Sequence, residues 1–489
     1  MKKIGIIGGG IGGLTGAIYL AKAGYQVTLY EKNKSLGGKM NTLRLGKYRF
    51  DTGPTLITMP QIPEEIFNRC DTRLSDHLKL VAIDPLCRYF FSDAILDAHA
   101  DFCAMKHAVR YFNPDEVGGL DRFFKYTQRI YKRAAEIFLN TPIHELSKVM
   151  RLKYWPSFFM LYQIDPFRTM HDAVSTYFKD PRLIQLFDRY ATYNGSNPFQ
   201  APATLNIIPY VEYKQGGYYI QGGLYRLVQV LERLAQDLGV EIRTQSCVQK
   251  ILHSDGRVTG VQTEKQVYPV EAVLCNMDVV ETFSRLIRDF PAVTNKLNAM
   301  EPSLSGVVFY WGIQIQSEQL VHHNILFSDD YYREFQQIFQ HEIPDDPTIY
   351  ISISSKTDPR NAPNGCENWF VFINTPYHNH QKWEPIISVL RKKIFDKLKK
   401  IDIHIENHIE VEQTRTPKDF YQLFNSNRGS IYGLSSNNPS SAFRRPANRN
   451  RILNGLYFAG GSAHPGGGVP LCMRSGKLAA NLMIERDLR

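Results

Sequence analysis

The first 31 residues constrain the fold more than any other part of the chain. A short apolar run at residues 3–7 leads directly into Gly8-Gly9-Gly10-Ile11-Gly12-Gly13, and a helix is predicted over residues 14–23. Gly8 permits a tight turn, Gly10 lets the backbone approach a pyrophosphate, and Gly13 lets helix and strand pack closely. The phosphates are then expected at the positive end of the helix. The pattern predicts a Rossmann-type dinucleotide-binding unit in which Gly8, Gly10, Ile11, Gly12 and Gly13 contact the cofactor.

Two further loops indicate which dinucleotide is bound. The predicted strand at residues 26–30 ends at Glu31, where a carboxylate accepts hydrogen bonds from the adenosine ribose and favours an unphosphorylated ribose over NADP. The segment KSLGGK at residues 34–39 completes the E-x5-GG-[RK] pattern of many FAD-dependent oxidases, and Lys39 can pair with a phosphate. A Gly/Pro-rich loop after Phe50 adds Thr55 and Leu56 as predicted contacts. Together these segments predict FAD as the cofactor.

The C-terminal segment is the most specific part of the sequence. Residues 456–470 read LYFAGGSAHPGGGVP, so a predicted strand ends in glycines before a helix predicted over residues 471–484. The amide groups that open this helix can face the flavin ring or the pyrophosphate. With the N-terminal motif, the segment resembles the carotenoid desaturase family, which includes the bacterial phytoene desaturases, and the resemblance extends over the whole chain. It implies that Gly461, Gly467, Gly468 and Val469 contact the cofactor.

Interior segments carry the same resemblance and suggest how the chain is divided. The segment at residues 240–244 resembles the strand before an adenine-contacting residue, here Val248, and residues 272–278 resemble the strand end that returns to the flavin at Asn276. The resemblance implies an α/β fold of the amine-oxidase and phytoene-desaturase type with an inserted α+β domain. The FAD-binding domain is expected at residues 1–84, 206–288 and 421–489, and the substrate domain at residues 85–205 and 289–420. Within the insertions we predict helices over 114–138 and 170–193 and strands over 305–314 and 347–354.

Charge and cysteine content exclude several other classes of protein. The chain has 58 Lys and Arg against 48 Asp and Glu, a net charge of +10, which suits an anionic partner. No zinc finger, RNA-binding motif or basic helix accompanies this charge, so an anionic membrane surface explains it better than a nucleic acid. The 7 cysteines form no CxxC pair and have no clustered histidines, so neither a disulfide framework nor a metal site is predicted.

One segment has a composition suited to a membrane surface. Residues 148–162 (KVMRLKYWPSFFMLY) interleave basic and aromatic side chains, as an element lying among lipid headgroups does. A helix packed on the protein's own core explains the pattern equally well. No window approaches the roughly 18 uninterrupted apolar residues of a transmembrane helix. We therefore expect a cytoplasmic protein, peripheral to the inner face of the membrane.

The resemblance also implies an activity, that of an FAD-dependent oxidoreductase acting on CH–CH bonds. Residues 190–205 and 427–433 look most like desaturases that act late in carotenoid pathways, which implies 3,4-desaturation of a 1'-hydroxycarotenoid, such as 1'-hydroxy-γ-carotene to 1'-hydroxytorulene. Phytoene or diapophytoene desaturation and oxidation of a terminal methyl group are alternatives within the family. A flavin amine oxidase and a non-catalytic lipid-binding escort protein are more remote alternatives.

Such a reaction depends more on how the protein positions the substrate than on acid–base groups. Oxidised flavin accepts the hydride, so the protein has to supply a long apolar channel that aims the correct bond at the ring. We therefore expect no catalytic triad. His464 and Asp51 are candidate proton acceptors because each is adjacent to a predicted flavin loop. A hydroxylated substrate also needs a polar partner, expected at the far end of the channel, which residue spacing does not locate.

Overall fold

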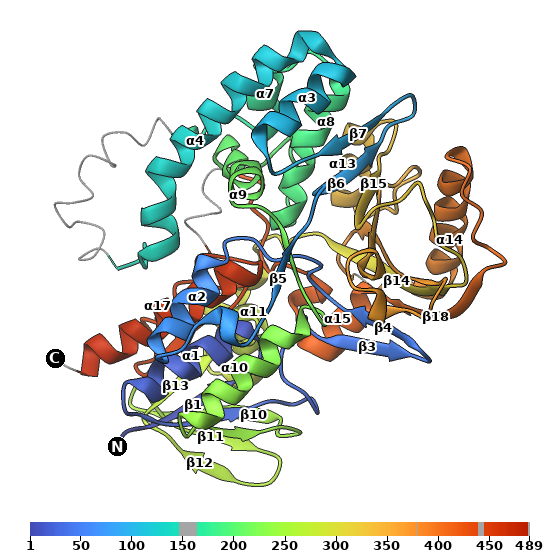
Figure 1. The fold of residues 1–489 in the computed structure, drawn as a ribbon. Coiled ribbons are helices and arrows are strands. Elements are labelled where there is room, and N and C mark those ends of the chain that lie inside the picture. The colour runs from blue at the N-terminus through green and yellow to red at the C-terminus, as the bar shows by residue number, and fades with distance from the viewer. Residues whose placement is uncertain (146–163, 379, 439–444, 488–489) are drawn as a thin grey trace.

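The computed structural model describes residues 1–145, 164–378, 380–438 and 445–487 (Figure 1). Its central element is a parallel sheet, built within these residues from five strands in the order β19-β13-β1-β2-β9. The strands are β1 (Lys3–Ile7), β2 (Gln26–Tyr30), β9 (Glu241–Arg243), β13 (Ala272–Cys275) and β19 (Leu456–Phe458). The sheet therefore joins segments from the beginning, the middle and the end of the chain.

Two helices pack against each other beside this sheet. Helix α1 (Ile11–Lys22) follows the glycine loop, and α17 (Val469–Asp487) follows the C-terminal glycines. The side chains from Ile11 to Leu20 are buried because neighbours cover α1 on all sides. The predicted strands at 3–7 and 26–30 are confirmed. Both helices begin two or three residues earlier than predicted, since the backbone turns helical directly after Gly10 and Gly468.

An antiparallel layer of three described strands covers part of the nucleotide sheet. It consists of β10 (Val248–Ser254), β11 (Arg257–Thr263) and β12 (Val267–Pro269). Val261 and Val258 of this layer share one apolar cluster with Ile7 and Val273 of the parallel sheet. Helix α10 (Tyr225–Asp237) follows the glycines at 222–223 and packs on α1.

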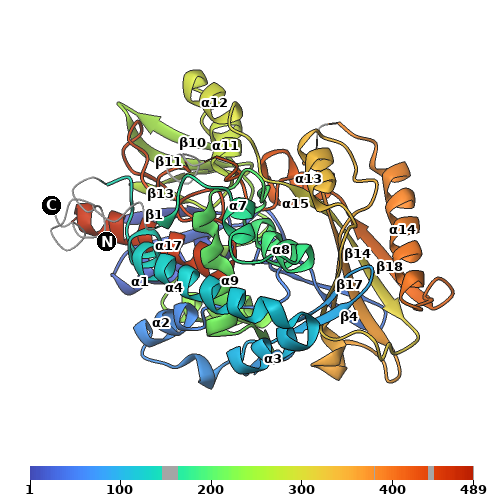
Figure 2. The same cartoon turned by 90° about the horizontal axis from the view of Figure 1, so that it is seen from above.

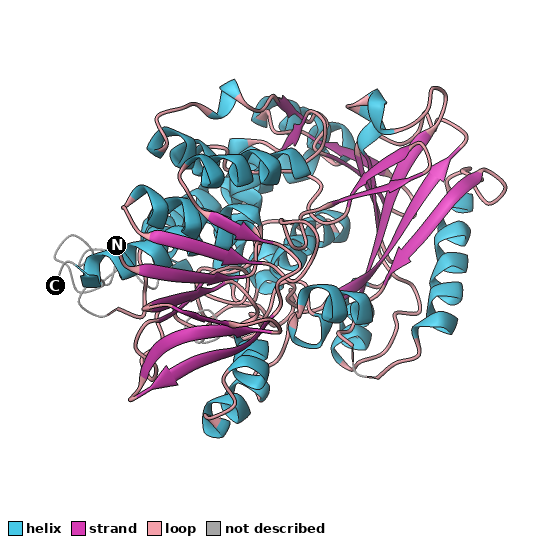
Figure 3. Cartoon of the chain, turned by 90° about the horizontal axis from the view of Figure 1, so that it is seen from below, coloured by secondary structure: helices cyan, strands magenta, loops and turns pink. Residues whose placement is uncertain are grey.

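A larger sheet forms the other half of the molecule (Figures 1 and 3). In the described residues its strand order is β18-β14-β17-β16-β15-β6-β7. The strands are β6 (Cys87–Phe90), β7 (Ile95–Ala98), β14 (Ser305–Ile313), β15 (His323–Leu326), β16 (Ile349–Ile353), β17 (Glu367–Thr375) and β18 (Ile409–Arg415). The strands predicted at 305–314 and 347–354 are thus confirmed as β14 and β16.

The two faces of this sheet bury different partners. Alternate residues of β14 point to opposite sides. Trp311 lies in one cluster with Leu390 and Ile394 of helix α14 (Trp383–Lys400), whereas Tyr310 lies in another with Phe50 of β4 (Tyr48–Asp51). The outer face is therefore covered by α14, as Figure 1 shows, and the inner face is turned toward the nucleotide-binding half.

The helical part of the first insertion differs from the prediction. The helix predicted at 170–193 is divided into α7 (Met170–Ser175), α8 (Pro181–Asp188) and a 3-10 helix (Arg189–Asn194). Asp180 marks the first break, before α8, because its side chain accepts a hydrogen bond from the Arg182 backbone amide and Pro181 occupies the first helical position. The helix predicted at 114–138 is present as α4 (Val117–Asn140), preceded by one turn of 3-10 helix.

The remaining elements connect these parts (Figure 2). They are β3 (Thr42–Leu45), β5 (Leu80–Ala82), β8 (Tyr218–Ile220), α2 (Gln61–Arg69), α3 (Phe102–Phe112), α9 (Ile207–Gln215), α11 (Val279–Glu281), α12 (Pro291–Asn298), α13 (Tyr331–Phe339) and α15 (Pro417–Phe424). The segment 148–162 lies outside the described residues, and the boundaries given for the two domains stay a prediction. No helix in the described part of the chain is both long and apolar enough to cross a bilayer.

The contact between α1 and α17 gives a stability test. A Cβ at Gly476 would lie 2.2 Å from the Gly12 carbonyl oxygen, so Gly476→Ala has to push the helices apart and should cost about 1–3 kcal/mol. Gly118→Ala is the matched control, because Gly118 is also helical and its Cβ would meet only the flexible end of Arg122, at 3.4 Å. Thermal unfolding at saturating FAD should show a lower melting temperature for the first variant alone. Equal melting temperatures would contradict the close helix contact.

Candidate functional site

The glycine loop after β1 is closely packed around Asn276. Gly8 has a φ of +94°, as its tight turn requires, and a Cβ at Gly13 would lie 2.2 Å from the Gly8 carbonyl oxygen. A Cβ at Gly10 or Gly12 would lie 2.7 Å or 2.6 Å from the side-chain amide of Asn276. These glycines therefore make room for a protein side chain as well as for an approaching ligand.

Asn276 itself stands at the carboxyl end of β13. Its backbone N–H donates to the Ile7 carbonyl oxygen at 2.8 Å, which places it beside the end of β1. Its side-chain Oδ1 is buried without a hydrogen-bond partner among the described residues. A buried acceptor without a donor is costly, so this oxygen is suited to receive a hydrogen bond from a ligand at the glycine loop. Helix α1 begins at the same loop and adds its positive end.

Glu31 lies at the end of the neighbouring strand β2. One carboxylate oxygen accepts a hydrogen bond from the Gly9 backbone N–H at 2.8 Å, and the other accepts two from Asn33, each at 2.8 Å. The side chain is buried, so these bonds fix the carboxylate beside the glycine loop. This is the position at which a Rossmann-type site holds the ribose of its nucleotide.

Two cations lie deep in the adjoining region. The Lys39 ammonium donates to the carbonyl oxygens of Ile431, at 2.6 Å, and Ser430, at 3.2 Å, and burial lowers its pKa to about 8 although Asp278 lies nearby. The Arg445 guanidinium donates to carbonyl oxygens including that of Gly461, at 2.6 Å, and burial lowers its pKa to about 10. Cations that are incompletely compensated in this way attract the phosphates of a dinucleotide.

The side chains around these cations are not completely covered. Lys39, Asp278, Tyr432 and Cys472 all lie deep in the protein and yet retain some accessible surface. The C-terminal glycines lie at the same place: a Cβ at Gly467 would be 2.8 Å from the Tyr432 ring, and Gly468, at a φ of +95°, has open space beside it. Val469 follows as the first residue of α17.

The other predicted contacts lie on two sides of this region. Thr55 is half-buried, and its hydroxyl is 2.5 Å from that of Tyr350 on β16. Leu56 packs beside Gly217. Val248, at the start of β10, is buried in the same cluster as Ile7 and so lies on the nucleotide side.

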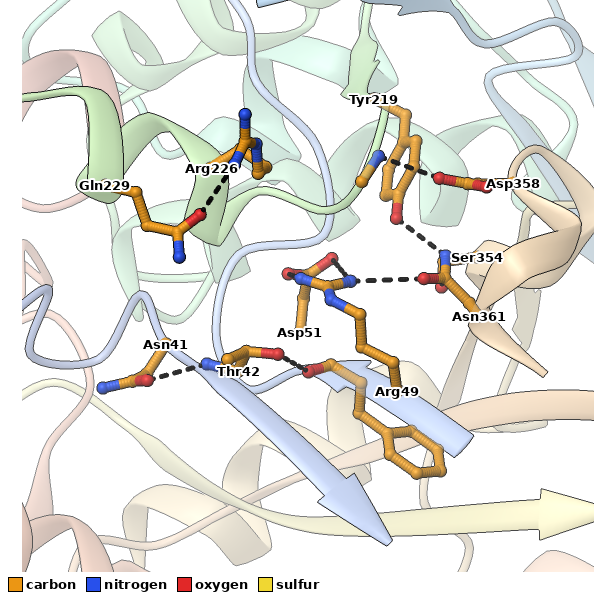
Figure 4. A network of polar contacts seen from close by, with 12 residues as sticks. Asn41, Thr42, Arg49, Asp51, Tyr219, Arg226, Gln229, Ser354, Asp358 and Asn361 are labelled. Carbon is orange, nitrogen blue, oxygen red and sulfur yellow. Dashed lines mark hydrogen bonds and ion pairs between the residues drawn. The ribbon is translucent and has the colours of Figure 1, made fainter. Parts of the chain in front are cut away.

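Asp51 is held in an ion pair (Figure 4). Its Oδ1 accepts a hydrogen bond from Arg49 Nη2 at 2.8 Å, and both side chains are buried. Arg49 also contacts Asn361, which donates in turn to the Tyr219 hydroxyl at 2.8 Å. The carboxylate of Asp51 therefore neutralises Arg49, which weakens the case for it as a proton acceptor.

His464 is buried and neutral. Its Nε2 lies 3.0 Å from the Thr141 carbonyl oxygen, and its ring contacts those of Phe138 and His144. Burial lowers the pKa of the imidazole to about 3. The side chain is therefore a weak base at neutral pH, and its contacts fix the loop before α17.

Several residues of the site carried no sufficient sequence signal. Arg445 lies outside every glycine motif, and only the structure shows that it bonds to the backbone at Gly461. Tyr432 and Asp278 belong to the segments 427–433 and 272–278, which resemble the family, but the sequence indicated no role for their side chains. The residues present fit FAD: a glycine-lined helix start, an acid for the ribose, cations for the phosphates, and open space beside Gly468. The fold and this site define a dinucleotide-dependent oxidoreductase.

Comparison with known proteins agrees with this class. The family model "Flavin containing amine oxidoreductase" matches residues 11–484. A 1-hydroxycarotenoid 3,4-desaturase from a Flavobacterium species is 40% identical over 99% of both chains. A 4,4'-diapolycopene oxygenase from a Methylomonas species is 33% identical over 99% of this chain and 98% of the relative, and a 4,4'-diaponeurosporene oxygenase from Staphylococcus haemolyticus is 34% identical over 98% and 96%.

Solved structures share the fold at low sequence identity. An oxidoreductase from Methanosarcina mazei superposes with a TM-score of 0.65 at 15% identity, covering 99% of this chain and 100% of that one. Cyclohexylamine oxidase from Brevibacterium oxydans gives a TM-score of 0.64 at 13% identity over 100% of both chains. The chain belongs to the flavin-containing amine oxidoreductase family, and its resemblance to the carotenoid desaturases is confirmed. It is an FAD-dependent oxidoreductase.

The position of Glu31 predicts its effect on cofactor binding. Glu31→Gln removes the charge from a buried acceptor, and a hydrogen bond to a charged group contributes about 1.5–3 kcal/mol. Titration of the apoprotein with FAD should therefore show a Kd at least about tenfold higher. Glu264→Gln, an exposed carboxylate in the three-stranded layer, is the control and should bind FAD as the wild type does. Unchanged affinity of Glu31→Gln would remove Glu31 from the site.

The buried state of His464 predicts a pH dependence of stability. The unfolded chain takes up a proton near the ordinary pKa of 6.5, whereas the folded imidazole does so only near 3, so acidification across this interval favours unfolding. As the pH is lowered through this interval, the free energy of unfolding should fall by up to about 1.4 kcal/mol less per pH unit in His464→Gln than in the wild type. Chemical denaturation between these pH values measures the slope. The exposed His404→Gln should keep the wild-type slope, and an unchanged slope in His464→Gln would contradict the neutral state.

Proposed function

We propose that this chain is a carotenoid desaturase that introduces a C=C bond at the 3,4-position of a 1'-hydroxycarotenoid, as in the conversion of 1'-hydroxy-γ-carotene to 1'-hydroxytorulene. The observation that carries the proposal is the 40% identity, over 99% of both chains, to a 1-hydroxycarotenoid 3,4-desaturase. Bound FAD supplies the hydride acceptor. The residues proposed to hold FAD are the individual cofactor contacts predicted from the sequence, of which Gly8 is the first and Val469 the last, together with Arg445.

The protein's own contribution is to position an apolar chain and exclude water. Tyr193, Tyr350 and Tyr432 lie deep in the protein, retain accessible surface and come from the 3-10 helix, the large sheet and the C-terminal region. Aromatic rings of this kind suit contact with a flat polyene, and we propose that they position its reacting bond. His464 and Asp51 stay low-ranked candidates for the proton acceptor, because one is neutral and the other is paired with Arg49.

The chemistry of the proposed substrate revises one expectation. The hydroxyl and the bond to be desaturated lie at the same end of this substrate. With the carbons of that end numbered from its terminus, the hydroxyl is on carbon 1 and a single carbon separates it from the 3,4-bond, so a polar group that binds the hydroxyl has to lie close to the reacting bond. The polar partner therefore belongs near the flavin-contacting loops, and not at the far end of the channel as first expected.

Oxidation of a terminal methyl group is the second candidate. The diapolycopene and diaponeurosporene oxygenases, at 33% and 34% identity, support it because they also align over nearly the whole chain. An amine oxidase is disfavoured by the buried Arg189 guanidinium, which lies over the rings of Tyr89, Tyr190 and Tyr193 at 4.4–5.3 Å. A cationic substrate would be repelled there, and the aromatic faces that could hold it already bind a cation.

We also propose that the enzyme takes its substrate from the inner face of the membrane. A carotenoid partitions into bilayers, and the net charge of +10 suits an anionic surface. Phe167, five residues after the stretch whose composition predicts membrane contact, is an apolar side chain with 84% of its surface exposed. Phytoene-type desaturation stays an alternative for the substrate.

Pigment analysis tests the proposed reaction. The gene is expressed in bacteria that make phytoene, lycopene, γ-carotene or 1'-hydroxy-γ-carotene, and the pigments are separated and their absorption is recorded. We expect a red shift of one added double bond in the hydroxylated background alone, because the new C=C bond is conjugated to the polyene. Gly13→Val is the inactive control, since its Cβ would overlap the Gly8 carbonyl oxygen. An aldehyde product would favour the oxidase, and no new pigment in any background would overturn the proposal.

A further inference from the structure

A buried polar cluster lies at the junction of the helical region and the large sheet. It consists of Arg189 and Tyr193 on the 3-10 helix, Glu212 on α9, and Tyr89 on β6. Arg189 Nη2 donates to the Tyr89 hydroxyl at 2.7 Å, and Tyr193 donates to Glu212 Oε2 at 2.5 Å. Apart from the aromatic ring of Tyr193, the mechanism proposed above uses none of these groups.

The cluster holds more hydrogen-bonding capacity than the protein satisfies. Arg189 Nε is buried with no partner in the described residues, and the nearest carboxylate oxygen, on Glu212, is 3.9 Å from its Nη2. A guanidinium removed from water in this way is costly unless its donors are used. The Tyr193 oxygen, which donates to Glu212, can also accept a hydrogen bond. The cluster thus offers both a donor and an acceptor, as binding of an alcohol requires.

The cluster lies close to both flavin-contacting loops. Tyr350 is near enough to Tyr193 to affect its ionisation, and the Tyr350 hydroxyl is 2.5 Å from that of Thr55. On the other side, Asn194 follows Tyr193 in the chain and contacts Arg445, which donates to the Gly461 carbonyl oxygen. Tyr193 also retains some accessible surface although it lies deep in the protein.

We infer that Arg189, Tyr193 and Glu212 form the site that binds the hydroxyl group on carbon 1 of the substrate. The inference rests on the proposed function and adds to it the residues that select a hydroxylated end. Only one carbon separates carbon 1 from the 3,4-bond, so the hydroxyl site has to lie near the flavin loops. The cluster meets this condition, because Tyr350 connects it to Thr55 and Arg445 connects it to Gly461. The apolar rings around it suit the methyl groups that flank a tertiary alcohol.

Selectivity between two substrates tests this site. The purified, FAD-loaded enzyme is assayed with 1'-hydroxy-γ-carotene and with the same molecule carrying hydrogen in place of the hydroxyl. We expect the wild type to prefer the alcohol at least tenfold in kcat/KM, because a site built for a hydroxyl leaves its polar groups unpaired without one. Tyr193→Phe should reduce this preference several-fold, and the charge-neutral pair Arg189→Met with Glu212→Gln should abolish it. The alcohol should also perturb the visible flavin spectrum at lower concentration in the wild type than in the variants.

Tyr126→Phe is the matched control. It removes another buried tyrosine hydroxyl that donates to a carboxylate, Asp165 at 2.7 Å, outside the cluster, and it should keep the wild-type preference. A wild type that converts both carotenoids equally would overturn the binding site alone, as would variants that keep the preference. In that case the unpaired groups are satisfied by buried water. A wild type that converts neither carotenoid would overturn the proposed function, and this site with it. Tyr193→Phe decides the matter if the double variant does not fold.

Discussion

The packing of Asn276 among glycines is the contact on which the cofactor-binding half depends. Its side chain occupies the space that Cβ atoms would take at Gly10, Gly12 and Gly460. The first glycine loop, the end of β13 and the C-terminal loop can meet only because each of these positions lacks a side chain. The close approach of the first glycine loop and the C-terminal loop also brings α1 against α17 at Gly476.

The two halves of the molecule treat buried charge differently. Near the cofactor loops, Lys39 and Arg445 bond mainly to backbone carbonyl oxygens, so their positive charge remains available to an anionic ligand. Elsewhere Arg49 is paired with Asp51, and Arg189 lies among aromatic rings beside Glu212. The cations near the glycine loops are therefore compensated mainly by backbone dipoles, whereas Arg49 faces a carboxylate and Arg189 mainly aromatic rings.

Local patterns predicted much of the first half and less of the second. The strands at 3–7 and 26–30 were predicted because glycine spacing and apolar runs are properties of adjacent residues. The break at Asp180 and Pro181 was missed, although an acidic residue before proline is a recognisable helix start. The pairing of Asp51 with Arg49 follows from two-residue alternation along one strand and could have been anticipated. The cluster around Arg189 could not, because its members meet only when a sheet strand and two separate helices pack together.

The strand order of the parallel sheet has a consequence for biosynthesis. β19 forms one edge of that sheet, yet it is the last of its strands to leave the ribosome, and α17 emerges after it. A nascent chain that already contains β1, β2, β9 and β13 still lacks an edge strand and exposes the apolar surface that α17 later covers. Long-range pairing of this kind delays completion of the fold and leaves that surface open to aggregation. The flavin site therefore becomes complete only after β19 and α17 have emerged and packed against the earlier strands and α1.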